Sequence, residues 1–208
     1  MHDPLLMLGT TLSGWAHEHD AATITSAHLR NREGRVTSAR PMMLEDLLAL
    51  IPAGKRVQLE IKAHADPELA ARTARALCRR YRHEQHRIEV ISFHSSACAA
   101  AAAHGYSSRL IVWTDNSPEQ MAAWALRSGV GGVSVEHFLL STHLAHVLRD
   151  AGLTINTGTI NEVELALRAI ELATPDAICS DRPIELRAEI EAAAAGEAER
   201  PRLSGARG

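Results

Sequence analysis

From about residue 41 onward, short apolar runs alternate with longer amphipathic, alanine-rich segments. The apolar positions of the longer segments recur with the helical period, and several of these segments begin at Ser or Pro and end at Gly or Arg. This pattern predicts helices at 41–50, 67–81, 95–104, 118–126, 142–151 and 161–173. It predicts strands at 57–61, 88–93, 109–113, 130–135, 153–157 and 177–180.

Strands that alternate with helices indicate a parallel α/β fold. Six strands are predicted, whereas an eight-stranded barrel typically has about 250 residues and thus one or two more strand–helix units. The count alone fits an open, doubly wound sheet equally well. No Gly-x-Gly-x-x-Gly step opens a helix near the N-terminus and no Walker loop occurs, so nothing supports nucleotide binding in such a sheet.

Two segments follow neither period. Residues 6–40 are rich in Thr, Ser, Gly, His and charged residues, and we expect a long loop near the mouth of a site. After residue 189 the chain becomes alanine-rich and then polar, which predicts a frayed helix and a disordered tail. We therefore expect one barrel-like domain over residues 1–188, and a frayed helix and disordered tail over residues 189–208.

Composition narrows the possible partners and the compartment. The net charge is −3 and aromatic residues make up only 3% of the chain, which disfavours nucleic acid and leaves a small neutral or anionic molecule as the favoured partner. No apolar run approaches the length of a membrane span. The three cysteines are odd in number and form no CxxC pair, so we expect small buried hydrophobes in a reducing compartment, the cytoplasm.

Glu60 and Lys62 are the strongest candidates for a site. They lie two residues apart in the predicted strand 57–61, so their side chains point to the same side of the sheet. In a closed barrel that side is the interior, and the carboxyl end of a barrel strand lies at the catalytic mouth. A carboxylate and an ammonium there could hold a divalent cation and a phosphate oxygen. A structural Glu–Lys ion pair is the alternative.

Histidine is abundant, with twelve residues, and this raises the question of a metal site. The densest acidic and histidine group consists of His17, His19, Asp20 and His28. Its spacing matches no standard zinc pattern, so a solvated loop is the favoured interpretation. His64 and Asp66 come just after the strand that carries Glu60 and are expected at most to line the mouth.

Several short motifs, taken in chain order, resemble those of the glycerophosphodiester phosphodiesterase family, whose members are metal-dependent TIM barrels of the phospholipase-C-like phosphodiesterase type. The motifs are His2-Asp3-Pro4-Leu5 with Thr10-Thr11, Pro41 to Leu47, Leu59-Glu60-Ile61-Lys62, Ser92-Phe93, and Ser180-Asp181-Arg182-Pro183. The resemblance covers nearly all of residues 2–183. It implies a TIM-barrel-like fold and a place in glycerophospholipid metabolism.

The resemblance also implies roles for individual residues. Glu60 matches a metal-ligating glutamate, Lys62 the lysine near the phosphate, and His2 a histidine that acts as general acid and base. Such a histidine suits phosphodiester cleavage because imidazole titrates near neutrality. The residues expected to line the substrate are Asp3, Phe93 and Asn161. The family's Trp-Thr-Val-Asn appears here as Gly158 to Asn161, so the tryptophan of the substrate mouth is replaced by glycine.

The family's first two motifs, His-Arg-Gly and Glu-x-Asp, precede the His-Asp step, and this sequence begins after both. We therefore expect an incomplete barrel with about six of eight strands. One carboxylate holds Mg²⁺ or Ca²⁺ weakly, so a divalent metal is expected to bind weakly at Glu60. Open barrel edges predict self-association.

Three hypotheses follow. The first is a phosphoric diester hydrolase that cleaves glycerophosphodiesters to sn-glycerol 3-phosphate and an alcohol, with its start recorded too late. The second is a non-catalytic remnant or binding module of the same fold. The third keeps the barrel but acts on choline phospholipids, as the related phospholipase D toxins do. Those toxins are secreted and disulfide-bonded, and the unpaired cysteines here argue against this third hypothesis.

Overall fold

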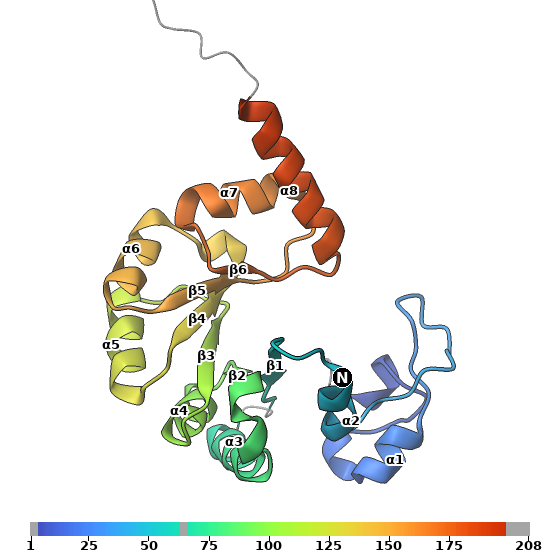
Figure 1. Ribbon diagram of the computed structural model, residues 1–208. Coiled ribbons are helices and arrows are strands. Elements are labelled where there is room, and N and C mark those ends of the chain that lie inside the picture. Colours follow the sequence, from blue (N-terminus) through green and yellow to red (C-terminus); the bar gives the residue numbers. More distant parts are fainter. Residues whose placement is uncertain (1–3, 63–65, 199–208) are drawn as a thin grey trace, which may run out of the picture. The chain divides into compact units, whose positions relative to one another are not determined.

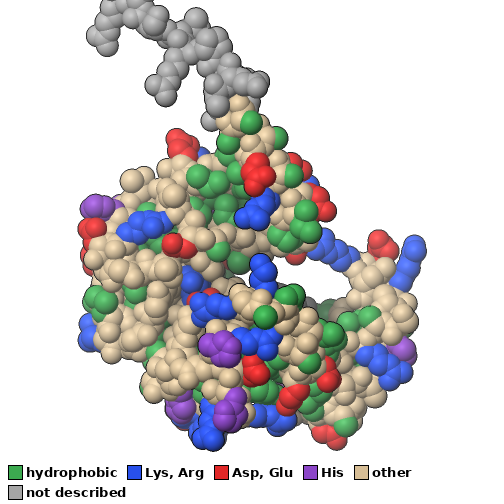
Figure 2. All heavy atoms as spheres, in the orientation of Figure 1, with side chains coloured by type: hydrophobic (Ala, Val, Ile, Leu, Met, Phe, Trp, Pro, Cys, Tyr) green, Lys and Arg blue, Asp and Glu red, His purple; other side chains and the backbone are tan. Residues whose placement is uncertain are grey.

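The computed structural model describes residues 4–62 and 66–198 (Figure 1). The chain divides into two compact units, Met1–Arg56 and Val57–Gly208. Charged side chains of both signs are interspersed over the face shown in Figure 2. Within the described residues, no helix is both long and apolar enough to span a bilayer.

The first unit is built from short elements. They are the 3-10 helices η1 (Leu6–Leu8) and η2 (Ala16–Glu18), the helices α1 (Ala21–Ser26) and α2 (Leu44–Leu50), and three isolated antiparallel bridges. The sequence pattern predicted one long loop over residues 6–40, and this prediction is wrong. Asp20 begins α1 by accepting a hydrogen bond from the Thr23 amide at 2.7 Å, and the fully buried Thr10 donates its hydroxyl to the Leu6 carbonyl at 2.9 Å.

The second unit is a parallel α/β structure. Its strands are β1 (Val57–Glu60), β2 (Ile88–Ser92), β3 (Ser107–Val112), β4 (Gly132–Val135), β5 (Thr154–Thr157) and β6 (Ala177–Ile178). Its helices are α3 (Pro67–Arg80), α4 (Ser95–Ala103), α5 (Pro118–Ser128), α6 (Thr142–Asp150), α7 (Val163–Ala173) and α8 (Pro183–Ala198), with the 3-10 helices η3 (Arg82–Arg87) and η4 (His137–Leu139). All six strands are parallel and paired in chain order.

This strand order decides between the two architectures that the sequence allowed. In a doubly wound sheet the order reverses at a switch point, whereas here each strand lies beside the next along the chain. The helices α4, α5 and α6 lie along the same side of the curled sheet (Figure 1). The described residues of this unit therefore form an incomplete TIM-barrel-like fold, as predicted.

The predicted elements of this unit are confirmed, with ends that differ by a few residues. Local signals explain this agreement. Ser117 accepts the Gln120 amide at the start of α5, where Pro118 occupies the first position, and Gly129 ends the helix in the left-handed conformation at φ 69°. Helix α8 continues to Ala198, into the segment 189–208 where a frayed helix and a disordered tail were predicted, and residues 199–208 lie outside the described residues.

The two faces of the sheet have opposite character. The outer face carries fully buried apolar side chains that pack against small residues of the helices, among them Val133, Val135, Ile155, Ala125 and Ala166. Register and alternation place the other strand positions on the opposite side, here called the inner face. Its members are Gln58, Glu60, Glu89, Ile91, Ser107, Arg109, Ile111, Gly132, Ser134, Thr154, Asn156 and Ala177.

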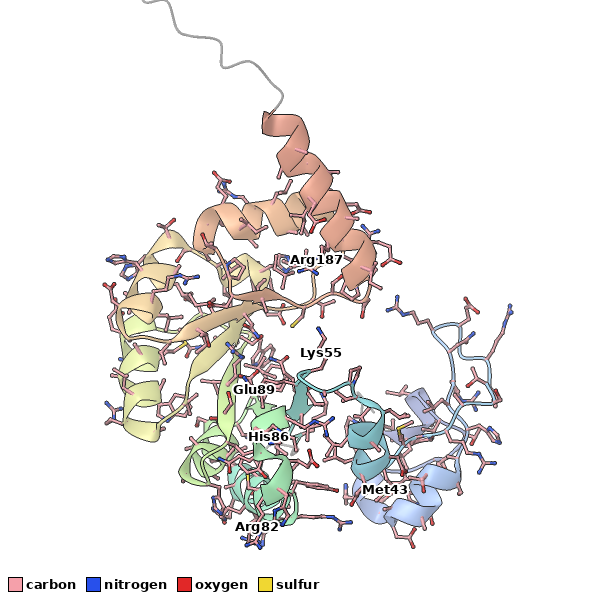
Figure 3. The ribbon with its side chains drawn as sticks, in the orientation of Figure 1. Met43, Lys55, Arg82, His86, Glu89 and Arg187 are labelled. Carbon is pink, nitrogen blue, oxygen red and sulfur yellow. The ribbon has the colours of Figure 1, made fainter. Side chains whose placement is uncertain are left out.

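A buried ion pair occupies the inner face near the amino ends of the strands. The Arg109 guanidinium lies 3.2 Å from the Glu89 carboxylate, and both side chains are about nine-tenths buried. Glu89, labelled in Figure 3, also accepts hydrogen bonds from Gln58 at 2.7 Å and from Ser107 at 3.2 Å. Since burying unpaired charge is expensive, these contacts are what allow the pair to exist in the fold.

Arg109 reaches across the neighbouring strands because Gly132 has no side chain. The guanidinium donates to the Val133 carbonyl at 3.0 Å and to the Thr154 hydroxyl at 3.1 Å. A Cβ atom at Gly132 would lie 2.3 Å from the Thr154 hydroxyl and 2.6 Å from Arg109 Nη1. The glycine that interrupts the apolar pattern of β4 therefore leaves the space that the Arg109 side chain occupies.

Gly132→Ala should lower the free energy of unfolding by about 2 kcal/mol or more, because its methyl group overlaps a backbone carbonyl and the guanidinium. Urea denaturation followed by circular dichroism measures the change. Gly131→Ala is the matched control, since the nearest atom to its new Cβ is 3.9 Å away. Equal stability of the two variants would contradict the packing role assigned to Gly132.

The Glu89–Arg109 pair predicts a pH dependence of stability. Burial alone would raise the pKa of Glu89, but the hydrogen bond from Gln58 and the charge of Arg109 hold it below the usual value of 4.5. A carboxylate with a lowered pKa in the folded state stabilises the fold above its unfolded pKa, and this stabilisation is lost as the pH falls through the folded pKa.

Glu89→Gln should therefore be less stable than the wild type at pH 7, and the difference should shrink on acidification below about pH 4. Urea denaturation at a series of pH values tests this. Glu164→Gln, on the exposed side of α7, removes the same charge without this network and serves as the control. A stability difference that stays constant with pH would contradict the assignment.

Candidate functional site

The carboxyl ends of the six parallel strands meet at one edge of the second unit, where barrel enzymes carry their catalytic groups. Inner-face residues at or just beyond these ends are the candidates for a site. They are Glu60 at the end of β1 and Lys62 after it, Phe93 after β2, Trp113 after β3, Glu136 after β4 and Gly158 after β5.

Glu60 and Lys62 are brought together as the sequence predicted. The Lys62 ammonium lies 2.8 Å from Glu60 Oε1, and their side chains are 29% and 23% exposed. Strand β1 ends at Glu60, and the hydrogen bond from the Ile61 amide to the Ile91 carbonyl at 2.8 Å extends the ladder by one residue. The pair is thus anchored on one side by the sheet and reaches solvent on the other.

Phe93 and Trp113 form an aromatic pair at the same edge. Their ring centroids are 6.5 Å apart with an interplanar angle of 87°, which is the favoured edge-to-face arrangement. They remain 47% and 64% exposed. Phe93 was predicted to line the substrate. Trp113 was missed as a site residue, although its position at the end of a predicted strand is the signal that could have found it.

Glu136 is a second residue that sequence reasoning missed. It follows β4 and lies beside Gly158, since a Cβ at Gly158 would be 2.9 Å from Glu136 Oε2 and 3.1 Å from Oε1. Its carboxylate therefore occupies the space that a side chain at position 158 would fill. The sequence signal is indirect, because nothing in the local pattern pairs residue 136 with residue 158.

Asn161 lies in a network that joins the end of β5 to the end of β6. Its side-chain oxygen accepts from the Ser180 hydroxyl and the Asp181 amide, both at 3.0 Å, and its side-chain nitrogen donates to Asp181 at 3.1 Å. Arg182 donates to the Asn161 carbonyl at 2.8 Å. These contacts give Asn161 a role in fixing the two loops, while contact with substrate stays a prediction.

Several predicted residues lie elsewhere. His2, Asp3 and His64 fall outside the described residues. In the first unit, His19 and His28 each contact a backbone carbonyl, Ser13 at 3.0 Å and Thr37 at 3.1 Å. Asp66 begins α3 by accepting the Glu68 and Leu69 amides at 3.0 Å, which is a helix-capping role.

A metal site is not complete in the part of the chain that the structure describes. No group of three His, Cys, Asp or Glu side chains converges among residues 4–62 and 66–198. At the end of β1 a hard cation would find the Glu60 carboxylate, already in contact with Lys62. One such ligand does not amount to the six to eight oxygen ligands that Ca²⁺ takes or the octahedron that Mg²⁺ requires.

The three cysteines are not paired with one another. Burial raises the pKa of Cys78 to about 11 and that of Cys98 to about 12, and it also raises the pKa of Cys179. The thiolate is the nucleophile and the metal ligand, so a raised pKa disfavours both roles for these cysteines at neutral pH. Cys78 and Cys98 are buried, in agreement with the prediction of small buried hydrophobes.

Comparisons with known proteins place the fold. No protein-family model matches the chain, and no curated protein sequence matches it. Solved structures do. A protein from Agrobacterium tumefaciens assigned as a glycerophosphoryl diester phosphodiesterase superposes with a TM-score of 0.75 at 19% identity, over 93% of this chain and 80% of that one. A glycerophosphodiester phosphodiesterase from Parabacteroides distasonis gives 0.69 at 20% identity, over 93% and 78%.

A third solved structure contains a ligand. A phosphodiesterase from Oleispira antarctica, in complex with the product sn-glycerol-3-phosphate, superposes with a TM-score of 0.74 at 21% identity, over 92% of this chain and 78% of that one. The fold that the sequence resemblance predicted is thus confirmed. This chain has the fold of the glycerophosphodiester phosphodiesterases.

Proposed function

We propose that this chain binds glycerophosphodiesters at the carboxyl edge of its sheet and hydrolyses them to sn-glycerol 3-phosphate and an alcohol. The observation that carries the proposal is the Glu60–Lys62 pair, with 2.8 Å between ammonium and carboxylate at the end of β1. The shared fold supports it, because one protein of this fold holds sn-glycerol-3-phosphate.

Lys62 is the residue proposed to contact the phosphate. Its ammonium offers three donors, of which Glu60 accepts one at 2.8 Å. A phosphodiester oxygen is a good partner for the remaining donors, since charge-assisted hydrogen bonds to phosphate are strong. Glu60 in turn fixes the position of the ammonium. In this proposal Phe93 and Asn161 line the substrate.

His2 is proposed as the general acid and base, with Asp3 beside it. Hydrolysis adds water across a P–O bond, so a proton must leave the water and another must reach the departing alkoxide. Imidazole suits both transfers near neutral pH.

A divalent cation, Mg²⁺ or Ca²⁺, is proposed to bind at Glu60 and to be held weakly. Such an ion would neutralise charge on the phosphate. The described residues supply one carboxylate at the end of β1, that of Glu60. Phosphate binding and proton transfer are therefore assigned to the side chains of the protein itself.

A second candidate function is binding without turnover. It is favoured by the same finding that the described residues bring one carboxylate, rather than a set, to the end of β1. A binding module of this fold would recognise the phosphate through Lys62 and release it unchanged.

Lys62→Gln should weaken the binding of sn-glycerol 3-phosphate about tenfold or more, because it removes the charge that meets the phosphate. Isothermal titration calorimetry measures this directly. Lys55→Gln is the matched control: it removes the same charge from the loop before β1, where Lys55 is exposed (Figure 3). Equal losses in the two variants would show a non-specific charge effect and contradict the site.

Glu60→Gln should abolish any metal-dependent hydrolysis while leaving the fold intact. The readout is release of sn-glycerol 3-phosphate with and without added Mg²⁺ or Ca²⁺. Full activity in this variant would overturn the assignment of Glu60. Metal-independent binding of sn-glycerol 3-phosphate with no turnover in the wild type would favour the binding module instead.

Self-association and compartment complete the proposal. Among the described residues, β1 and β6 each pair with one strand, and a groove of about 630 Å³ lined by Ile178 and the 81% exposed Ile184 lies beside β6. We propose association through these edges, which sedimentation velocity would detect.

The unpaired cysteines support a reducing compartment, the cytoplasm, to be checked by cell fractionation.

A further inference from the structure

A row of inner-face positions continues the sheet beyond the ends of β3, β4 and β5. Val112 pairs with Val135 in the last register of β3 and β4, so the next residues, Trp113 and Glu136, are neighbours. Two hydrogen bonds extend the ladder into this row, from the Glu136 amide to the Val112 carbonyl at 3.1 Å and from the Gly158 amide to the Val135 carbonyl at 3.0 Å. The row is therefore held by the sheet itself.

Gly158 leaves room for the Glu136 carboxylate. A Cβ at position 158 would lie 2.9 Å from Glu136 Oε2, which is closer than such contacts occur in proteins, and 3.1 Å from Oε1, which is tighter than most of them. The absence of a side chain at this position thus determines where the negative charge of Glu136 sits.

The Glu136 carboxylate has no protein counter-ion in the described part of the chain. No hydrogen bond or ion pair to its oxygens occurs there, although the residue is partly buried. Partly buried charges are usually paired, because leaving water without a partner is unfavourable. A carboxylate held in this way suits a positively charged ligand.

Two aromatic rings border the same position. Trp113 adjoins Glu136 in the row, and Phe93 meets Trp113 edge to face with 6.5 Å between centroids. Both rings are about half exposed or more and contact each other, and adjacent exposed apolar side chains often mark a ligand-binding surface. Aromatic faces attract cations, and together with a carboxylate they form the arrangement that recognises quaternary ammonium groups.

We infer that Glu136, Trp113 and Phe93 form a subsite for a cationic headgroup, so that the chain prefers glycerophosphodiesters whose alcohol carries an ammonium group, such as choline. This inference rests on the proposed function.

The spacing along the edge fits such a substrate. Lys62 follows β1 and Glu136 follows β4, three strand spacings away, or roughly 14 Å between backbones at about 4.8 Å per strand. Register and alternation place both residues on the inner face of the sheet. A zwitterionic ligand can therefore place its phosphate toward Lys62 and its ammonium toward Glu136.

The experiment is a titration of the full chain with choline, followed by the NMR signal of the Trp113 indole and assigned with Trp113→Phe. The neutral isostere 3,3-dimethylbutan-1-ol is the matched ligand. We expect choline to shift the signal at millimolar concentration and the isostere to leave it unchanged. Glu136→Gln should weaken choline binding about tenfold, whereas Glu164→Gln, on an exposed position of α7, should not.

Equal shifts from choline and its isostere, or unchanged choline affinity in Glu136→Gln with circular dichroism of a folded protein, would overturn the subsite. The parallel substrate test compares glycerophosphocholine with glycerophosphoglycerol. If Glu136-dependent choline binding is found but neither diester is bound or hydrolysed, the proposed function fails and the cation subsite stands. If both diesters are processed equally and Glu136→Gln changes neither, the subsite fails and the proposed function stands.

Discussion

The buried Arg109–Glu89 pair is the interaction on which the second unit depends. Through it, β1 and β2 are joined by the Gln58–Glu89 hydrogen bond, and β3 is joined to β4 and β5 by the contacts of Arg109 with Val133 and Thr154. Five neighbouring strands thus share one polar network on the inner face. Because a buried charge without its partner is strongly destabilising, the network fixes the register of these strands as well as their proximity.

That register also builds the candidate site. Each strand that contributes a residue to the network carries a site residue two to four positions further along, on the same inner face. These site residues are Glu60, Phe93, Trp113, Glu136 and Gly158. The amino end of the inner face is therefore structural and the carboxyl end is available for chemistry, which is the division that parallel barrel enzymes use. Along this edge the ammonium of Lys62 follows β1 and the carboxylate of Glu136 follows β4. The two aromatic rings, Phe93 and Trp113, follow β2 and β3 between them.

The sequence predicted the elements of this unit because its signals are local. Periodicity, Pro118 at a helix start and Gly129 at a helix end act within one turn of chain, and Glu60 and Lys62 lie two residues apart on one strand. The sequence did not predict the roles of Trp113, Glu136 and Arg109, because their partners are 20 to 45 residues away along the chain. Only the pairing of the strands shows that Gly132 leaves room for the Arg109 side chain. The segment 6–40 was wrongly expected to be one loop, since its short helices and bridges carry no periodic pattern.

In the proposed reaction, this chain cleaves glycerophosphodiesters on the alcohol side of the phosphate. The most direct measurement follows glycerophosphocholine by ³¹P NMR in the presence of the full chain and Mg²⁺ or Ca²⁺. We expect the diester signal to decline while that of sn-glycerol 3-phosphate grows. A diester signal that remains unchanged, or one replaced by the signal of phosphocholine, would contradict the proposed cleavage.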